Sequence, residues 1–217
     1  VDGIISLTSY FDINTLKTLS EQCPIVLACE NIEGISMPSV TINNILGAET
    51  MTRYLIEKGH KDIAYISGPL NGILGKYRMK GFKQEMLKNK LKVNDDWIFE
   101  GDFTIQSGYD IGMKIIQLDT LPSAIFAAND EMAIGIIKVL TKHGIRVPND
   151  ISIVGFDNIV LSEIITPELT TYAQPVEEIG NQAIRKLLDL IENKALKEMD
   201  TLLEGTVLER QSTKNIK

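Results

Sequence analysis

Residues 122–145, PSAIFAANDEMAIGIIKVLTKHGI, contain the two local patterns that decide the fold. The run 124–128 is apolar and β-prone, which is typical of a buried strand. Apolar residues then recur at helical spacing from Met132 to Leu140, which predicts an amphipathic helix. A buried strand that passes directly into a helix is the basic unit of an α/β protein.

Two polar residues, Asn129 and Asp130, join the predicted strand to the predicted helix. One interpretation is helix capping, because Asn and Asp side chains accept hydrogen bonds from the free N–H groups of a first helical turn. The other is ligand binding, because open α/β sheets bind small molecules at the carboxyl ends of their strands. Taken alone, the two residues favour capping. The choice between capping and ligand binding depends on the rest of the chain.

The same unit repeats along most of the chain. The apolar runs predict strands at 1–7, 25–29, 40–42, 63–67, 97–100, 124–128, 151–156, 169–175 and 206–209. The helical periodicity predicts helices at 14–21, 48–58, 77–88, 106–118, 133–142 and 176–191. Near-continuous apolar strands with helical crossovers predict an α/β fold with parallel sheets that are covered on both faces.

Composition and net charge limit the classes of function that the chain can have. The 217 residues carry a net charge of −7, so the surface as a whole would repel a phosphate backbone. No apolar run approaches the roughly 20 residues that span a bilayer. Cys23 and Cys29 are the only cysteines, and we interpret them as buried thiols in a reducing compartment.

The motifs expected of an enzyme or a metal site do not occur in the sequence. His60 and His143 each lie beside a glycine near a predicted helix end, and no Cys or His has metal-type spacing. The glycines of 67–75, SGPLNGILG, match neither the dinucleotide fingerprint nor the phosphate loop. We therefore expect no metal, no cofactor and no enzymatic activity.

Eight phrases carry a resemblance to a known family. In chain order they are VDGII, PSVTINNILGA, LIEKGHKDIAYISGP, YRMKGF, EGDFTIQSGYD, residues 122–158, TPELTTYAQPVEEIG and ERQST. In this order and spacing they resemble the regulatory core of lactose-repressor-type (LacI/GalR) transcription regulators. The resemblance covers nearly the whole chain. It implies two similar Rossmann-like subdomains with parallel sheets, in the manner of type I periplasmic binding proteins.

The resemblance also implies an organisation. The chain would cross three times between an N-terminal subdomain, residues 1–42 and 174–203, and a C-terminal subdomain, residues 43–173 and 204–217. A small effector, with a sugar as the expected class, would bind in the cleft between them. We interpret the chain as part of a longer cytoplasmic homodimer, in which an upstream headpiece reads operator DNA. A protein co-regulator is a further partner that the resemblance allows.

Five residues are the predicted effector contacts. Arg78 in YRMKGF offers a planar fork of donors for vicinal hydroxyls or a carboxylate, and Asp157 offers a charged acceptor. Phe103 offers a ring face for a sugar or a base. The resemblance shifts Asn129 from capping to ligand contact, leaves Asp130 as the plain helix cap, and adds Glu30 from the other side of the cleft.

Alternatives stay open at this point. A secreted sugar-binding receptor of a transport system has the same fold, and an upstream signal peptide would favour it. An enzyme that uses Asp157 or Asp130 lacks a nucleophile–base pair. A purine effector is disfavoured, because Gly72 and Leu74 occupy positions where purine-responsive members carry polar side chains.

Overall fold

The computed structural model describes residues 1–7, 13–30, 32 and 34–216, and it divides the chain into two compact units. Unit 1 comprises residues 1–43 and 175–205, and unit 2 comprises residues 44–174 and 206–217. The chain thus passes from one unit to the other after Asn43, after Gln174 and after Gly205.

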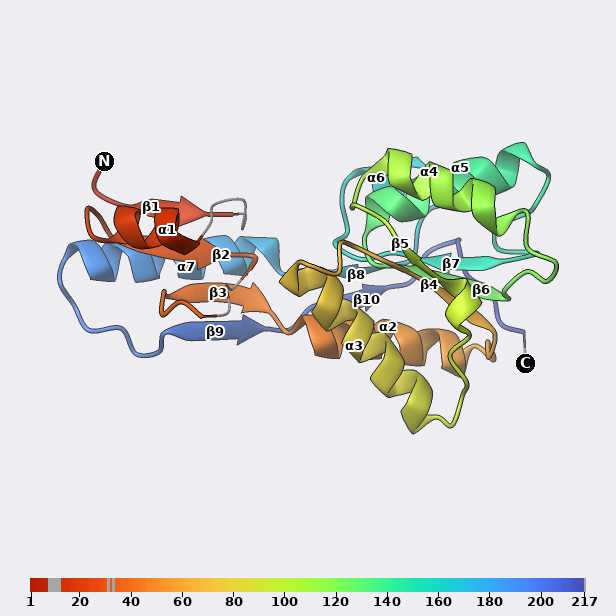
Figure 1. The fold of residues 1–217 in the computed structure, drawn as a ribbon, viewed down its shortest axis with the longest axis horizontal. Coiled ribbons are helices and arrows are strands. Elements are labelled where there is room, and N and C mark those ends of the chain that lie inside the picture. The colour runs from red at the N-terminus through yellow and green to blue at the C-terminus, as the bar shows by residue number, and fades with distance from the viewer. Residues whose placement is uncertain (8–12, 31, 33, 217) are drawn as a thin grey trace. The chain divides into compact units, whose positions relative to one another are not determined.

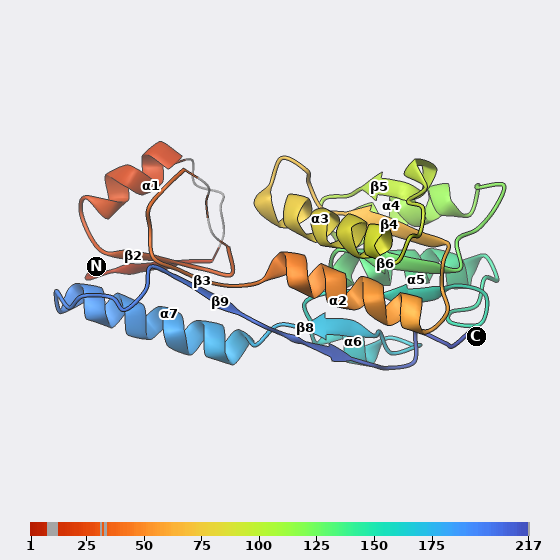
Figure 2. The same cartoon turned by 90° about the horizontal axis from the view of Figure 1, so that it is seen from below.

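Unit 1 is a four-stranded parallel sheet in the order β1-β2-β3-β9. Its elements are β1 (Ile4–Ser6), α1 (Ile13–Ser20), β2 (Ile25–Ala28), β3 (Ser39–Ile42), α7 (Val176–Ile191) and β9 (Asp200–Leu203). Helices α1 and α7 cover opposite faces of this sheet (Figure 2). Leu16 of α1 packs with Ile25, Leu27 and Met37 in a small apolar core.

Unit 2 contains a second four-stranded parallel sheet, in the order β5-β4-β6-β7. The strands are β4 (Ile63–Ser67), β5 (Ile98–Glu100), β6 (Ala124–Ala127) and β7 (Ser152–Val154). A two-stranded antiparallel ribbon, β8 (Thr171–Ala173) with β10 (Thr206–Leu208), completes the unit. The strands predicted at 169–175 and 206–209 form this ribbon.

Helices cover both faces of the unit 2 sheet. They are α2 (Asn44–Glu57), α3 (Ile73–Lys88), α4 (Ile105–Ile115), α5 (Asp130–Lys142) and α6 (Leu161–Ile164), with a short 3-10 helix at Asp95–Trp97. Helices α2 and α3 pack together on one face, and α4 and α5 pack together on the other (Figure 1). An added Cβ at Gly81 of α3 would lie 2.2 Å from the Ile45 carbonyl oxygen of α2, so only glycine permits this approach.

The apolar periodicity located the buried face of α5 correctly. Met132, Ile136, Val139 and Leu140 are all fully buried. The core on the other face of the sheet is aromatic: the Tyr65 ring stacks on Phe82 at a centroid distance of 4.6 Å. Burial of side chains this large contributes about 1.5–3 kcal/mol each, so these contacts stabilise the sheet that carries the loops of unit 2.

Three helices begin three or four residues earlier than the sequence predicted. The structure starts α2 at Asn44, α3 at Ile73 and α5 at Asp130, whereas the predicted starts were residues 48, 77 and 133. Each first turn contains polar residues or glycine, so the apolar periodicity does not extend into it. Strand β9 and helix α6 were missed, because their short segments show no clear period.

Within the described part of the chain, no helix combines the length and the apolar character that crossing a membrane requires.

Candidate functional site

Four of the five predicted site residues meet at one edge of the unit 2 sheet. Phe103, Asn129 and Asp157 follow the carboxyl ends of β5, β6 and β7, and Arg78 belongs to α3, the helix after β4. In a parallel sheet these ends lie along one edge, where α/β proteins bind small ligands. The fold therefore brings together residues that lie up to 79 positions apart in the sequence.

Arg78 is the centre of this edge. It is only 3% exposed, and its guanidinium lies 3.9 Å from the centroid of the Phe156 ring. Nε donates to Asn44 Oδ1 at 2.9 Å, and Nη1 donates to the Ala128 carbonyl. Nη2 lies 3.2 Å from Asp157 Oδ1. The buried charge is thus neutralised by one carboxylate and held in place from α2 and from the end of β6.

Asp157 is the member of the ion pair that reaches solvent, with 26% of its side chain exposed. Gln174 Nε2 donates to its Oδ1 at 2.6 Å, and its backbone has a φ of 110° in the turn after β7. Burial raises the pKa of the Asp157 carboxyl, although Arg78 and the Gln174 hydrogen bond oppose that rise. Its carboxylate is therefore oriented from two sides and still accessible to a ligand.

Asn129 is the N-cap of α5. Its Oδ1 accepts from the Met132 N–H at 3.0 Å, and its Nδ2 donates to the Phe103 carbonyl at 2.8 Å. The amide therefore fixes the helix start to the loop after β5. One donor and one acceptor position of the amide have these partners, so the group keeps one further N–H donor and one further acceptor position.

The prediction that Asp130 is the plain cap was wrong. Asp130 is the first residue of α5 and is fully buried. Its carboxylate accepts from Thr171 Oγ1 at 2.6 Å and from the Ile159 N–H at 2.9 Å. Burial raises its pKa to about 7, with a smaller contribution from the negative charge of Asp157. Asp130 therefore joins α5, β8 and the turn after β7, and this role has no local sequence signal.

Phe103 lies in the loop after β5 with a φ of 69°. Its ring packs across the backbone of Gly68, where an added Cβ would lie 1.9 Å from a ring carbon. The Arg78 guanidinium lies 6.0 Å from the ring centroid. Phe103 is half-buried, so part of the ring remains available for the apolar face of a ligand.

Gly68→Ala is expected to displace the Phe103 ring and to lower the free energy of unfolding by about 1–2 kcal/mol. Urea denaturation of the single variants and of the double variant with Phe103→Ala gives the coupling between the two positions. The expected loss is smaller in the Phe103→Ala background, because the ring that the new methyl group meets is then absent. Equal losses in both backgrounds would contradict the contact.

Glu30 is placed in unit 1, partly buried, two residues beyond the end of β2. Its role in binding stays a prediction. The other four predicted residues form one constellation within unit 2.

Three residues of this constellation were missed by sequence reasoning. Asn44 and Gln174 are the residues of unit 2 that adjoin two of the chain crossings, and each holds one member of the Arg78–Asp157 pair. The sequence feature that could have identified Asn44 and Gln174 is their position near the predicted crossings between the subdomains. Phe156, whose ring lies against the guanidinium, reads in the sequence as an ordinary apolar strand residue.

The polar groups at this edge are arranged for hydrogen bonding. A guanidinium, a carboxylate and an amide are oriented by neighbouring groups, and the half-buried Phe103 ring lies beside the guanidinium. Planar polar groups suit vicinal hydroxyls, and the ring suits C–H faces. Among the described residues, no group of three His, Cys, Asp or Glu side chains has the arrangement of a metal site.

The chain matches a known protein family. The family model of the periplasmic binding protein-like domain matches residues 52–213. The chain belongs to this family, in the branch of LacI-type regulators. The predicted α/β fold with parallel sheets in the manner of periplasmic binding proteins is thereby confirmed.

Two curated relatives show the branch. This LacI-type core is 38% identical over 196 residues to the HTH-type transcriptional repressor PurR of Histophilus somni, with 89% of the chain and 59% of the relative covered. It is 37% identical over 216 residues to the catabolite control protein A of Priestia megaterium, with 99% and 65% covered. The chain thus spans about three fifths of the length of these relatives.

Among solved structures, the complex of the transcriptional regulator CelR with cellobiose superposes with a TM-score of 0.91. The identity is 31%, and 98% of this chain and 66% of that chain are covered. The relatives are transcriptional repressors and regulators, as expected for a protein that is not an enzyme.

Proposed function

We propose that this chain is the effector-binding core of a LacI-type transcription regulator, and that its effector is a sugar. The observation that carries the proposal is the convergence of Arg78, Asn129, Asp157 and Phe103 at one edge of the unit 2 sheet. We assign these four residues to effector binding, with Glu30 of unit 1 as a further contact.

The electrostatics of the site support a polyhydroxylated ligand. Arg78 is already neutralised by Asp157 at 3.2 Å, so the pair as a whole carries no net charge to attract an anion. Three of the five guanidinium N–H groups point at Asn44, Ala128 and Asp157, which leaves two donors beside a carboxylate acceptor. Adjacent donors and acceptors of this kind suit neighbouring hydroxyl groups, which donate and accept at once.

The regulatory step follows from thermodynamic linkage between effector binding and the conformation of the protein. A ligand shifts an equilibrium between two conformations only by its differential affinity for them. Asn44 and Gln174 hydrogen-bond to the Arg78–Asp157 pair and adjoin two chain crossings. We propose that an effector that reorients this pair changes the geometry of the crossings. Such a change would reach a DNA-binding headpiece in the whole protein.

The relatives support the wider setting of the proposal. PurR of Histophilus somni is an HTH-type transcriptional repressor, so we propose operator DNA as a partner of the whole protein and the cytoplasm as its location. A homodimer fits a repressor that reads two half-sites. A protein co-regulator is a further candidate partner.

A thermal-shift screen tests the ligand class. The panel contains pentoses, hexoses, disaccharides, phosphosugars and purines. A ligand that binds the native state raises the midpoint by mass action, by several degrees at about 100 times its Kd. We expect a neutral sugar to give the largest shift, because the Arg78–Asp157 pair is already neutralised.

The best ligand is then titrated by calorimetry into two matched variants. Asp157→Asn is expected to raise the Kd at least tenfold, which corresponds to the loss of one charge-assisted hydrogen bond of about 1.5 kcal/mol. Asp119→Asn, an exposed acid outside the site, is expected to leave the Kd unchanged. A purine or phosphosugar as the best ligand would refute the sugar assignment, and equal Kd values for both variants would refute the site.

A further inference from the structure

A separate surface of unit 2 carries a charge pattern that effector binding does not use. Six lysines lie between residues 76 and 92, and Glu85 is the only acid in that stretch of a chain whose net charge is −7. Glu85 is buried and is bound by Arg53 at 3.0 Å. The stretch is therefore strongly positive on a negative protein.

Part of this charge forms a line along α3. Lys76, Lys80, Lys83 and Leu87 lie within about 60° of one another around the helix axis, at 100° per residue. We call these four residues the α3 stripe. All four are exposed, and Leu87 has 75% of its surface accessible. The stripe is about 17 Å long, or three helical turns.

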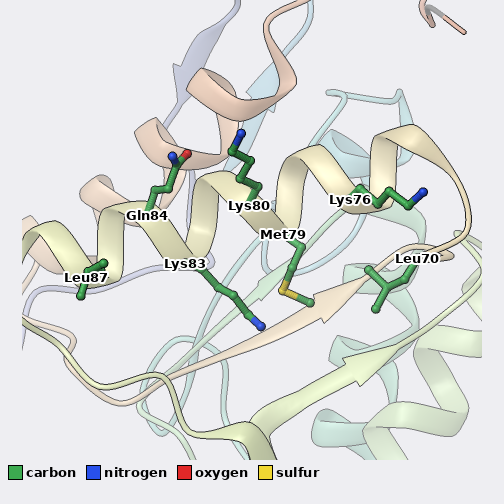
Figure 3. A pocket seen from close by; sticks show the side chains of 7 residues that line it. All are labelled: Leu70, Lys76, Met79, Lys80, Lys83, Gln84 and Leu87. Atoms are coloured by element: carbon green, nitrogen blue, oxygen red, sulfur yellow. The ribbon is translucent and has the colours of Figure 1, made fainter. Parts of the chain in front are cut away.

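The stripe borders a shallow pocket of about 510 Å³. Figure 3 shows that its lining comes from α3, with Leu70 added by the loop that precedes the helix. Met79 and Leu70 give the pocket an apolar floor, and the lysine side chains spread on both sides of the helix (Figure 3). The surface thus alternates cationic and apolar groups.

The lysines of the stripe have no ion-pair partner among the described residues. Other lysines do, for example Lys58 with Glu209 at 2.6 Å. Like charges three and four positions apart destabilise a helix, so Lys76, Lys80 and Lys83 act against the stability of α3. An external partner that brings carboxylates to these positions would remove that repulsion.

We infer that the α3 stripe is a docking surface for an acidic amphipathic helix of a partner protein. Charge complementarity selects carboxylates that face Lys76, Lys80 and Lys83. The exposed Leu87 and the apolar floor select a partner that also offers apolar side chains. A nucleic acid fits less well, because the stripe offers neither an aromatic platform nor an unpaired arginine.

The test uses fluorescence anisotropy of a labelled helical peptide, about 18 residues long, with a Glu face beside a Leu face. The receptor is the 217-residue chain. The triple variant Lys76→Glu, Lys80→Glu, Lys83→Glu is expected to raise the Kd at least tenfold, and Leu87→Ser about threefold or more. The control triple Lys61→Glu, Lys138→Glu, Lys142→Glu changes the net charge equally at exposed lysines elsewhere on unit 2. It is expected to raise the Kd less than threefold.

A scrambled peptide of the same composition and a single-stranded oligonucleotide complete the design. Weaker binding of both, with the variant pattern above, supports the inference. Equal binding of the scrambled peptide, equal loss in both triple variants, stronger binding of the oligonucleotide, or no binding of the amphipathic peptide would each overturn it. Thermal unfolding of each variant confirms that it is folded. The effector titration does not involve these residues, so the two proposals can fail independently.

Discussion

Asp157→Ala is expected to lower the free energy of unfolding of unit 2 by about 3 kcal/mol. The substitution leaves the Arg78 guanidinium, 3% exposed, without the carboxylate 3.2 Å away. A buried charge without its partner costs several kcal/mol, and partial access of water to position 157 keeps the loss at the lower end of that range. Urea denaturation with a constant m-value measures it.

Two further variants identify the cause of this loss. Asp119→Ala removes an exposed acid and is expected to change the free energy of unfolding by less than about 0.5 kcal/mol. Arg78→Met combined with Asp157→Ala is expected to lose less than the two single variants together, because no charge is then left unpaired. Additive losses, or an Asp157→Ala loss below about 1 kcal/mol, would contradict a buried ion pair.

The second large effect concerns Asp130 and pH. Its pKa is about 7 in the folded protein and has an ordinary value of 3.8. Between about pH 4 and pH 7 the folded state therefore binds more protons than the unfolded state, so stability falls as pH rises through this window. The full difference is at most about 4 kcal/mol, complete above pH 7 and absent below pH 4.

Asp130→Asn is expected to remove most of this pH dependence. The amide imitates the protonated acid: its Nδ2 can donate to Thr171 Oγ1, and its Oδ1 can still accept from the Ile159 N–H. The measurement is urea denaturation of both proteins from pH 5 to pH 8. The variant should gain stability relative to the unmodified chain as pH rises to 7.

Comparison at each pH separates Asp130 from other titrating groups. Burial also raises the pKa of Asp157, which acts in the same direction, and lowers the pKa of His60, which acts in the opposite one. Both are common to the two proteins, so to first order the difference reports Asp130. A stability difference that does not change between pH 5 and pH 8 would show that Asp130 titrates normally.

The sequence predicted the fold well where one pattern dominates. Helix α7 begins at Val176 and ends at Ile191 as predicted, because its apolar residues keep a 3.6-residue period along the whole helix. The predicted start of a helix was wrong where the first turn of that helix is polar. Asp130 read as a cap because local sequence cannot show that Thr171, 41 residues later, supplies its hydrogen bond.

The candidate site was predicted as a set of residues and not as a network. Arg78, Phe103, Asn129 and Asp157 were chosen through the resemblance, and three strand ends explained their convergence in advance. The pairing of Arg78 with Asp157, and the supports from Asn44 and Gln174, depend on contacts between residues 17 to 79 positions apart. Such contacts have no period in the sequence, so only the structure supplies them.

Hydrogen–deuterium exchange with the effector found in the screen tests the location of the site most directly. We expect slower exchange in four segments at the carboxyl ends of the unit 2 strands: residues 67–70, 101–104, 127–130 and 155–158. The outer turns of α3 should exchange at the same rate with and without effector. Slower exchange that avoids all four segments would contradict the site at Arg78 and Asp157.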